Sequence, residues 1–121
     1  RLLLDLFHTD LGRLLDFRGQ VSMDKVLIDP ETGHRRLKLR REKVDLSQQT
    51  IYVTYMVDDV DGQGAVHRTL VTFSTRYLFR AEIEHLLQRA GFAVEVIYGS
   101  YDLDDFSSDS DKMITVARRL D

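Results

Sequence analysis

The chain has 121 residues, of which 43% are hydrophobic and 31% are charged, so it can build one domain with an apolar core. It has no cysteine, which excludes disulfide frameworks, cysteine-ligated zinc sites and cysteine nucleophiles. No apolar run approaches the ~20 residues of a membrane helix, and the net charge of -3 argues against a dedicated nucleic-acid binder. We therefore expect a cytoplasmic protein with neither membrane nor nucleic-acid partners.

The chain begins with an apolar run that predicts a strand. Residues 2–7 show no alternation of apolar and polar side chains, which is typical of a strand buried on both faces. A short helix is predicted from Asp10 to Phe17. A strand buried on both faces needs helices above and below it, and the sequence offers only two helices. We therefore expect sequence missing before Arg1, with a complete small α+β domain as the alternative.

Four consecutive strands with no helix between them predict an antiparallel meander. They are expected at residues 21–28, 37–44, 51–57 and 66–79. Turns are expected at Asp29–Gly33 and Asp58–Gly64, because proline and glycine supply the backbone angles that turns need. In the second strand Leu37 and Leu39 alternate with charged residues, so we expect its charged face to be solvated.

A helix and two strands are predicted after the meander. Apolar residues recur at i, i+3, i+4 and i+7 within Ala81–Ala90, and Gly91 follows as a C-terminal cap. Strands are expected at 93–98 and 113–117, separated by an acidic loop. The first strand, this helix and the strand at 93–98 form a βαβ unit, and the last strand returns antiparallel.

The predicted fold class is α+β. Residues 1–17 and 80–121 are expected to form a three-stranded remnant of an α/β sheet, and residues 18–79 an antiparallel β-lid inserted into it.

The order of these elements and the residues at both ends of the chain resemble the C-terminal half of a class I S-adenosylmethionine-dependent methyltransferase. RLLLDLF at 1–7 looks like the fifth strand of that family, and RYLFRAEIEHLLQRAGF at 76–92 is similar to its late segment, where an aromatic strand leads into a helix ending in Ala-Gly-Phe. VEVIYG at 94–99 resembles the sixth strand, and MITVARR at 113–119 resembles the antiparallel seventh, which slots between the fifth and the sixth. The meander matches only in kind, as the β-lid that many small-molecule methyltransferases insert.

The resemblance implies a parent transferase that uses S-adenosylmethionine to methylate a small-molecule acceptor. It places the cofactor site before Arg1, because the family's glycine-rich turn after the first strand and its acidic residue after the second are absent here. The one G-x-G, at 62–64, lies between two antiparallel strands and opens no helix. We expect this chain alone to bind no cofactor and to transfer no methyl group.

Four residues are candidates for the substrate side. His8 follows the first strand at its carboxyl end, where open α/β sheets bind ligands, and it is a weak candidate for a general base, with a polar loop residue as the alternative. Tyr77 and Phe79 share one face of the long predicted strand and are candidates to roof a substrate pocket. Arg76 points the other way, toward an anionic substrate group or toward solvent. No metal site is expected, because no two histidines lie four residues apart.

Two other functions stay open at this point. In one, the chain is a complete binding module whose antiparallel sheet wraps on the helix at 81–90 and encloses an apolar ligand. In the other, it is a dimerisation module whose exposed β-edges pair between two chains, and a homodimer of that kind is compatible with the methyltransferase interpretation. The sequence before Arg1, or cofactor binding by a longer chain, discriminates among the three.

Overall fold

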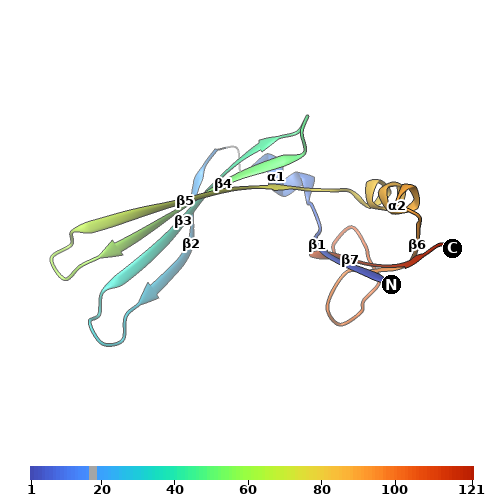
Figure 1. Cartoon of the computed structure of the whole chain (residues 1–121). Coiled ribbons are helices and arrows are strands. Elements are labelled where there is room, and N and C mark those ends of the chain that lie inside the picture. The colour runs from blue at the N-terminus through green and yellow to red at the C-terminus, as the bar shows by residue number, and fades with distance from the viewer. Residues whose placement is uncertain (17–18) are drawn as a thin grey trace. The chain divides into compact units, whose positions relative to one another are not determined.

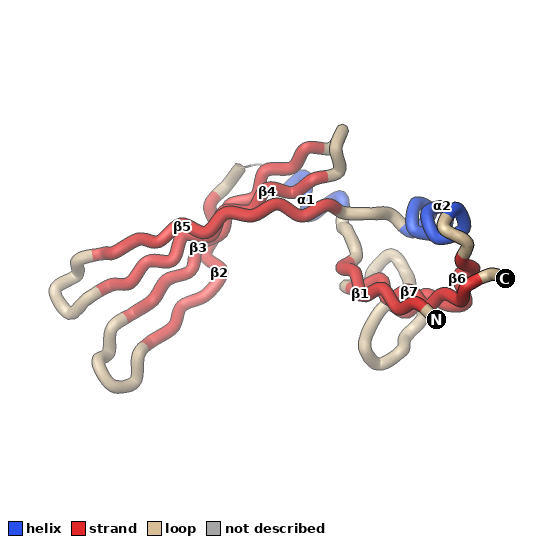
Figure 2. The backbone as a smooth tube through the Cα atoms, viewed as in Figure 1, coloured by secondary structure: helices blue, strands red, loops and turns tan. Residues whose placement is uncertain are grey.

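The computed structural model describes residues 1–16 and 19–121, and for residues 13, 14 and 16 it describes the backbone alone. The described strands form two antiparallel sheets (Figures 1 and 2). The chain divides into two compact units, the first made of Arg1–Asp10 with Tyr77–Asp121 and the second of Leu11–Arg76. The elements in chain order are β1 (Leu2–Phe7), α1 (Leu11–Asp16), β2 (Val21–Ile28), β3 (Arg35–Asp45), β4 (Thr50–Val60), β5 (Val66–Arg76), α2 (Arg80–Arg89), β6 (Phe92–Tyr98) and β7 (Lys112–Arg119).

The first unit contains a three-stranded sheet in the order β1-β7-β6. The central strand β7 pairs antiparallel with both neighbours, so β1 and β6 run parallel to each other, as predicted. Helix α2 packs beside β6, and the core lies between the helix and the sheet. The buried core residues of this unit are Ile83, Leu87, Ile97, Met113 and Ala117.

Strand β1 is buried on one face only, so the predicted burial on both faces is wrong for this chain. Its even-numbered residues Leu2, Leu4 and Leu6 pack against the core, whereas Leu3 is 64% exposed and Phe7 is half-exposed. The physical reason is that α2 is the one helix in the described part of this unit, so only one side of the sheet is covered.

Helix α2 forms where its apolar stripe predicts it, with its ends set by local contacts. Ile83 and Leu87 are buried. The Glu82 carboxylate accepts the backbone N–H of Phe79 at 3.1 Å, which stabilises the first turn. Gly91 has a φ of +85°, the left-handed conformation that glycine adopts after a helix, and its carbonyl accepts the N–H of Leu120 at 2.7 Å.

The second unit contains α1 and the predicted meander, a four-stranded sheet in the order β2-β3-β4-β5. All its pairings are antiparallel, and the pairing of β3 with β4 is in register from Arg35 to Asp45. Helix α1 ends at Asp16, and Phe17, the predicted last residue of that helix, lies outside the described residues. The assignment of this unit as a lid inserted into a methyltransferase sheet stays a prediction.

Strand β5 ends three residues earlier than predicted. Its last partner pair is Thr50 with Arg76, because β4 begins at Thr50 and offers no backbone beyond it. Tyr77 and Phe79 therefore do not lie on the long strand, and the prediction that they share one face of it is wrong. They form instead the segment that leads into α2.

Candidate functional site

The best-defined candidate site lies at the carboxyl end of β1, around His8. The backbone N–H of His8 donates to the carbonyl of Asp111 at 2.9 Å, and its ring is half-buried. Ring atom Nδ1 lies 2.6 Å from the carbonyl oxygen of Ser110. Main chain and side chain are thus both held by the loop that joins β6 to β7, a segment about a hundred residues away in the sequence.

The contact with Ser110 determines which ring nitrogen of His8 carries the hydrogen. A backbone carbonyl can only accept a hydrogen bond, so Nδ1 must be the donor. In the neutral ring Nε2 then has no hydrogen and keeps a free lone pair. An imidazole oriented by an acceptor at Nδ1 and basic at Nε2 is the arrangement that general-base histidines use.

An aromatic residue completes the surroundings of His8. The ring of Phe106 meets the imidazole edge to face, with centroids 4.9 Å apart and planes at 75°. The guanidinium carbon of Arg80, the first residue of α2, lies 5.8 Å from the centroid of the Phe106 ring. The site therefore gathers groups from β1, from the β6–β7 loop and from the start of α2.

The structure brings Tyr77 and Phe79 together, while Arg76 belongs to the other unit. The rings of Tyr77 and Phe79 pack edge to face with their centroids 5.6 Å apart. Tyr77 is 2% exposed and Phe79 is half-buried. Arg76 is exposed at the last position of β5. Its predicted role toward an anionic substrate group stays a prediction.

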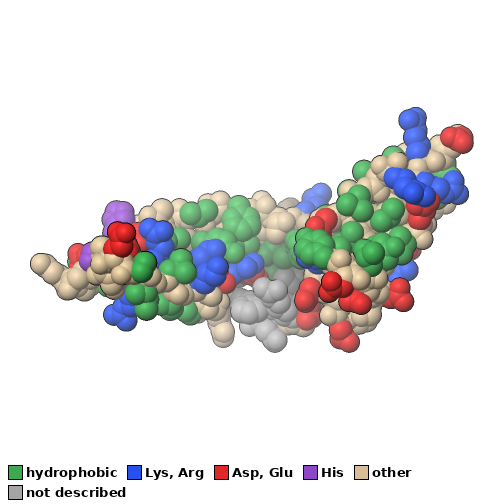
Figure 3. Space-filling model, turned by 90° about the horizontal axis from the view of Figure 1, so that it is seen from below, with side chains coloured by type: hydrophobic (Ala, Val, Ile, Leu, Met, Phe, Trp, Pro, Cys, Tyr) green, Lys and Arg blue, Asp and Glu red, His purple; other side chains and the backbone are tan. Residues whose placement is uncertain are grey.

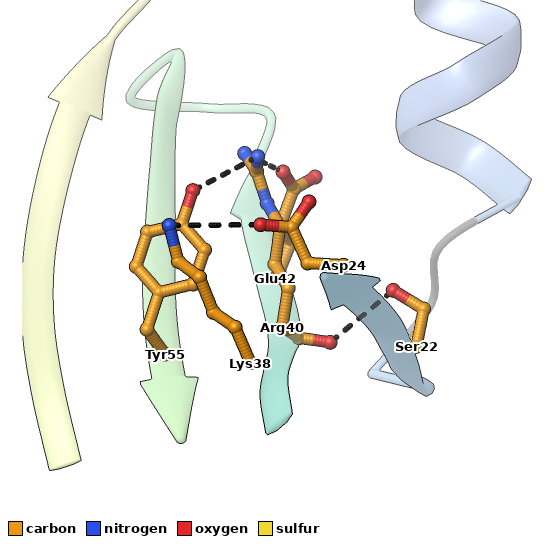
Figure 4. A network of polar contacts seen from close by, with 6 residues as sticks. All are labelled: Ser22, Asp24, Lys38, Arg40, Glu42 and Tyr55. Carbon is orange, nitrogen blue, oxygen red and sulfur yellow. Dashed lines mark hydrogen bonds and ion pairs between the residues drawn. The ribbon is translucent and has the colours of Figure 1, made fainter. Parts of the chain in front are cut away.

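A polar network on the four-stranded sheet was missed by the sequence interpretation (Figure 4). Glu42 is 5% exposed and its carboxylate pairs with the guanidinium of Arg40, which also donates to the hydroxyl of Tyr55 at 3.2 Å. The ammonium of Lys38 lies 4.0 Å from the centroid of the Tyr55 ring and 3.6 Å from the Asp24 carboxylate. The charged face of β3 is therefore not solvated at Glu42, in contrast to the prediction.

Alternation of charge and apolar residues cannot tell which face of a strand is covered, and this explains the error. The sequence held one signal for the burial of Glu42, which is an acidic residue inside a run of basic ones. A carboxylate can be buried when neighbouring cations compensate its charge.

A groove of about 590 Å³ lies at the end of this sheet, between the β2–β3 turn and the β4–β5 turn. All three of its carboxylates have partners: Asp29 and Asp61 accept backbone N–H groups of their own turns, and Asp59 pairs with Arg36 at 2.6 Å. Hydrogen bonds from the backbone N–H groups of Glu31 and Thr32 lower the pKa of Asp29. Asp29 and Asp61 thus stabilise their own turns, and Asp59 links β4 to β3 through Arg36.

The described residues do not form a cradle for S-adenosylmethionine. The G-x-G at 62–64 lies in the β4–β5 turn, and α2 begins after Phe79 without a glycine-rich turn. The described part of the chain also holds no group of three or more histidine, aspartate and glutamate side chains that could bind a metal ion. Within the same residues no helix has the length and apolar character needed to cross a membrane.

Comparison with known proteins gives a fold and no sequence family. No protein-family model matches the chain, and no curated protein matches it in sequence. Among solved structures, the CcbJ methyltransferase from Streptomyces caelestis is similar with a TM-score of 0.68 and 16% identity, over 98% of this chain and 43% of that one.

Two further solved structures share the fold. An S-adenosylmethionine-dependent methyltransferase from Clostridium acetobutylicum has a TM-score of 0.68 and 9% identity over 98% of this chain and 45% of its own. The sugar N-methyltransferase KedS8 from a Streptoalloteichus species has a TM-score of 0.55 and 15% identity, over 86% of this chain and 37% of its own. The chain thus has the fold of one part of these enzymes and spans less than half the length of each.

Proposed function

We propose that this chain is the C-terminal, substrate-side part of a class I S-adenosylmethionine-dependent methyltransferase that acts on a small molecule. The observation that carries the proposal is the extent of the likeness: three methyltransferase structures cover 86–98% of this chain and it covers 37–45% of theirs. On this proposal the residues that bind S-adenosylmethionine belong to sequence outside the chain.

His8 is the proposed general base of the parent enzyme. Its Nε2 lone pair would accept the proton of an acceptor N–H or O–H group as that atom takes the methyl group. Phe106, against the ring, limits the access of water from one side. Phe79 stays as the proposed wall of the acceptor pocket, with the buried Tyr77 packed behind it, and the four-stranded sheet stays as the proposed lid.

The test is the reading frame upstream of the Arg1 codon. The proposal expects roughly 100 codons or more that encode a strand, a glycine-rich turn opening a helix, and an acidic residue ~20 positions further on. A start codon at Arg1 or directly before it would contradict the proposal. The chain would then be a complete α+β domain, and its use as a ligand-binding or dimerisation module would be the remaining interpretation.

A further inference from the structure

The loop that joins β6 to β7 is closed on one residue, Gly99, which directly follows β6. The backbone N–H of Gly99 donates to the carbonyl of Asp104 at 2.8 Å, and the N–H of Lys112 donates to the carbonyl of Gly99 at 3.3 Å. The N–H of Phe106 donates to the carbonyl of Ile97 at 3.4 Å. The main chain of the loop is therefore folded back onto the end of β6, and Gly99 joins its two ends.

The half-buried residues of this loop are the ones that hold His8. The acidic side chains of the loop are exposed, and Figure 3 shows acidic side chains at the surface of this unit: Asp102, Asp104, Asp105, Asp109 and Asp111. Phe106 and Ser110 are half-buried, and both contact the imidazole. The position of the His8 ring thus depends on how closely the loop lies against β6.

Gly99 lets Ser110 lie directly against the main chain at the end of β6. A Cβ atom at position 99 would overlap the Ser110 hydroxyl, and it would lie 2.8 Å from the Ser110 Cβ and 3.2 Å from the carbonyl oxygen of Asp105. Carbon atoms in contact are about 3.5–4.0 Å apart, so Ser110 would have to move by about 1 Å. The φ of Gly99 lies outside the left-handed region, so this position requires space and not a special backbone conformation.

A displacement of Ser110 acts on His8 through one short hydrogen bond. The Cβ of Ser110 is bonded to its own main chain, so the carbonyl moves with it. The carbonyl oxygen lies 2.6 Å from Nδ1 of His8, and a further ~1 Å takes it beyond the ~3.2 Å limit of a good hydrogen bond. Strand β1 is paired with β7 as far as Phe7, which keeps the main chain of His8 in place. Loss of this acceptor removes what favours a hydrogen on Nδ1 over one on Nε2.

We propose that Gly99 is a positioning residue: its missing side chain places the Ser110 carbonyl so that His8 carries its hydrogen on Nδ1 and keeps the Nε2 lone pair free. That this lone pair takes a proton during methyl transfer rests on the proposed function. The position of the hydrogen on the ring does not, so the two can be tested separately.

The first measurement locates the ring hydrogen of His8 by NMR. The protein is the product of the longest reading frame that contains this chain, labelled with ¹⁵N in its histidine rings and kept at about pH 9, where histidine rings are neutral. The His8 signals are the ones lost in His8→Gln. A ring nitrogen that bears a hydrogen resonates far from one that does not, so the spectrum reports the tautomer. The wild type is expected to hold Nδ1–H as its main tautomer, and a hydrogen mainly on Nε2 would overturn the proposal.

The second measurement adds one methyl group at Gly99. Gly99→Ala is expected to lower the ratio of Nδ1–H to Nε2–H by about fivefold or more, the contribution of one hydrogen bond. The matched control is Gly62→Ala, because the φ of Gly62 also lies outside the left-handed region and an added Cβ would lie at an ordinary 3.6 Å from Nε2 of His34. An unchanged ratio in Gly99→Ala, or an equal loss in both variants, would overturn the proposal.

Ser110→Gly provides a second background for the same change. It removes the two atoms that the added methyl group would meet and keeps the carbonyl that His8 contacts, so this variant is expected to retain Nδ1–H. In this background Gly99→Ala should change the tautomer ratio by less than about twofold. If Gly99→Ala alone fails to fold, the double variant is compared directly with Ser110→Gly. Loss of Nδ1–H in Ser110→Gly itself, an equal effect of Gly99→Ala in both backgrounds, or a double variant that does not fold would each overturn the proposal.

Activity of the same proteins separates this inference from the proposed function. If both hold, kcat for methyl transfer falls in Gly99→Ala and returns in the double variant, in step with the population of the Nδ1–H tautomer. A protein that transfers no methyl group while its tautomer responds as described would contradict the proposed function and support the positioning role of Gly99. A tautomer that does not respond would overturn the positioning role whatever the activity.

Discussion

Replacing Ile83 with alanine tests whether α2 and β7 form the core of the first unit. The Ile83 side chain is 2% exposed and belongs to the buried cluster with Leu87 and Met113. The substitution removes three carbon atoms, which is about 2.4 kcal/mol of transfer free energy at about 0.8 per carbon. The cavity left behind raises the cost to about 3 kcal/mol. A unit of about 55 residues is stable by only about 3–8 kcal/mol, so the substitution removes a large part of its stability.

Hydrogen exchange of the β7 amides under native conditions measures this loss directly. A loss of about 3 kcal/mol corresponds to exchange about 100-fold faster, because 1.4 kcal/mol is a factor of ten. Leu86→Ala is the matched control on the same helix, and since that side chain is 52% exposed it should cost about 1 kcal/mol and leave no cavity. Equal acceleration by the two variants would refute the packing of α2 on this sheet through Ile83.

Three further predictions concern the proposed base, one ion pair and one helix end. In the longer protein, His8→Gln should lower kcat by about 10²-fold or more. The control His85→Gln, on the exposed side of α2, should leave kcat unchanged. Equal kcat values for the wild type and both variants would refute the role of His8. The hydrogen bonds from Arg68 lower the pKa of Asp58, so this pair stabilises the folded state above pH ~4, and the stabilisation is lost as the pH falls through the lowered folded pKa. Urea unfolding of Asp58→Asn should accordingly depend less on pH below pH ~4 than that of the wild type, and an unchanged pH dependence would count against the pair. Because Gly91 has a positive φ, Gly91→Ala should lower the free energy of unfolding by about 1 kcal/mol and asparagine there by less, whereas no loss with alanine would contradict the left-handed helix end.

Much of the fold was predictable because local signals agreed with the tertiary structure. The apolar stripe of α2, the glycine after it and the turn residues of the meander each specify an element without knowledge of its neighbours. The central position of β7 came from the family resemblance, and its nearly complete burial at 113–115 agrees with that position.

The errors came from features that depend on what covers an element. A run of leucines predicts a strand, but whether Leu3 is buried depends on a second layer that the described unit does not contain. The end of β5 depends on where its partner β4 begins, which no residue of β5 encodes. The orientation of His8 depends on the Ser110 carbonyl in a loop about a hundred residues away. The sequence therefore identified His8 as a candidate but could not predict its hydrogen-bond partner.

Binding of S-adenosylmethionine, measured by titration calorimetry on two proteins side by side, tests the proposed function most directly. One protein is the product of the longest reading frame that contains this chain, and the other is the 121-residue chain itself. The proposed function predicts one binding site on the longer protein and no heat of binding to the 121-residue chain alone. A longer protein that is folded and binds no S-adenosylmethionine would contradict it, and so would full binding by the 121 residues.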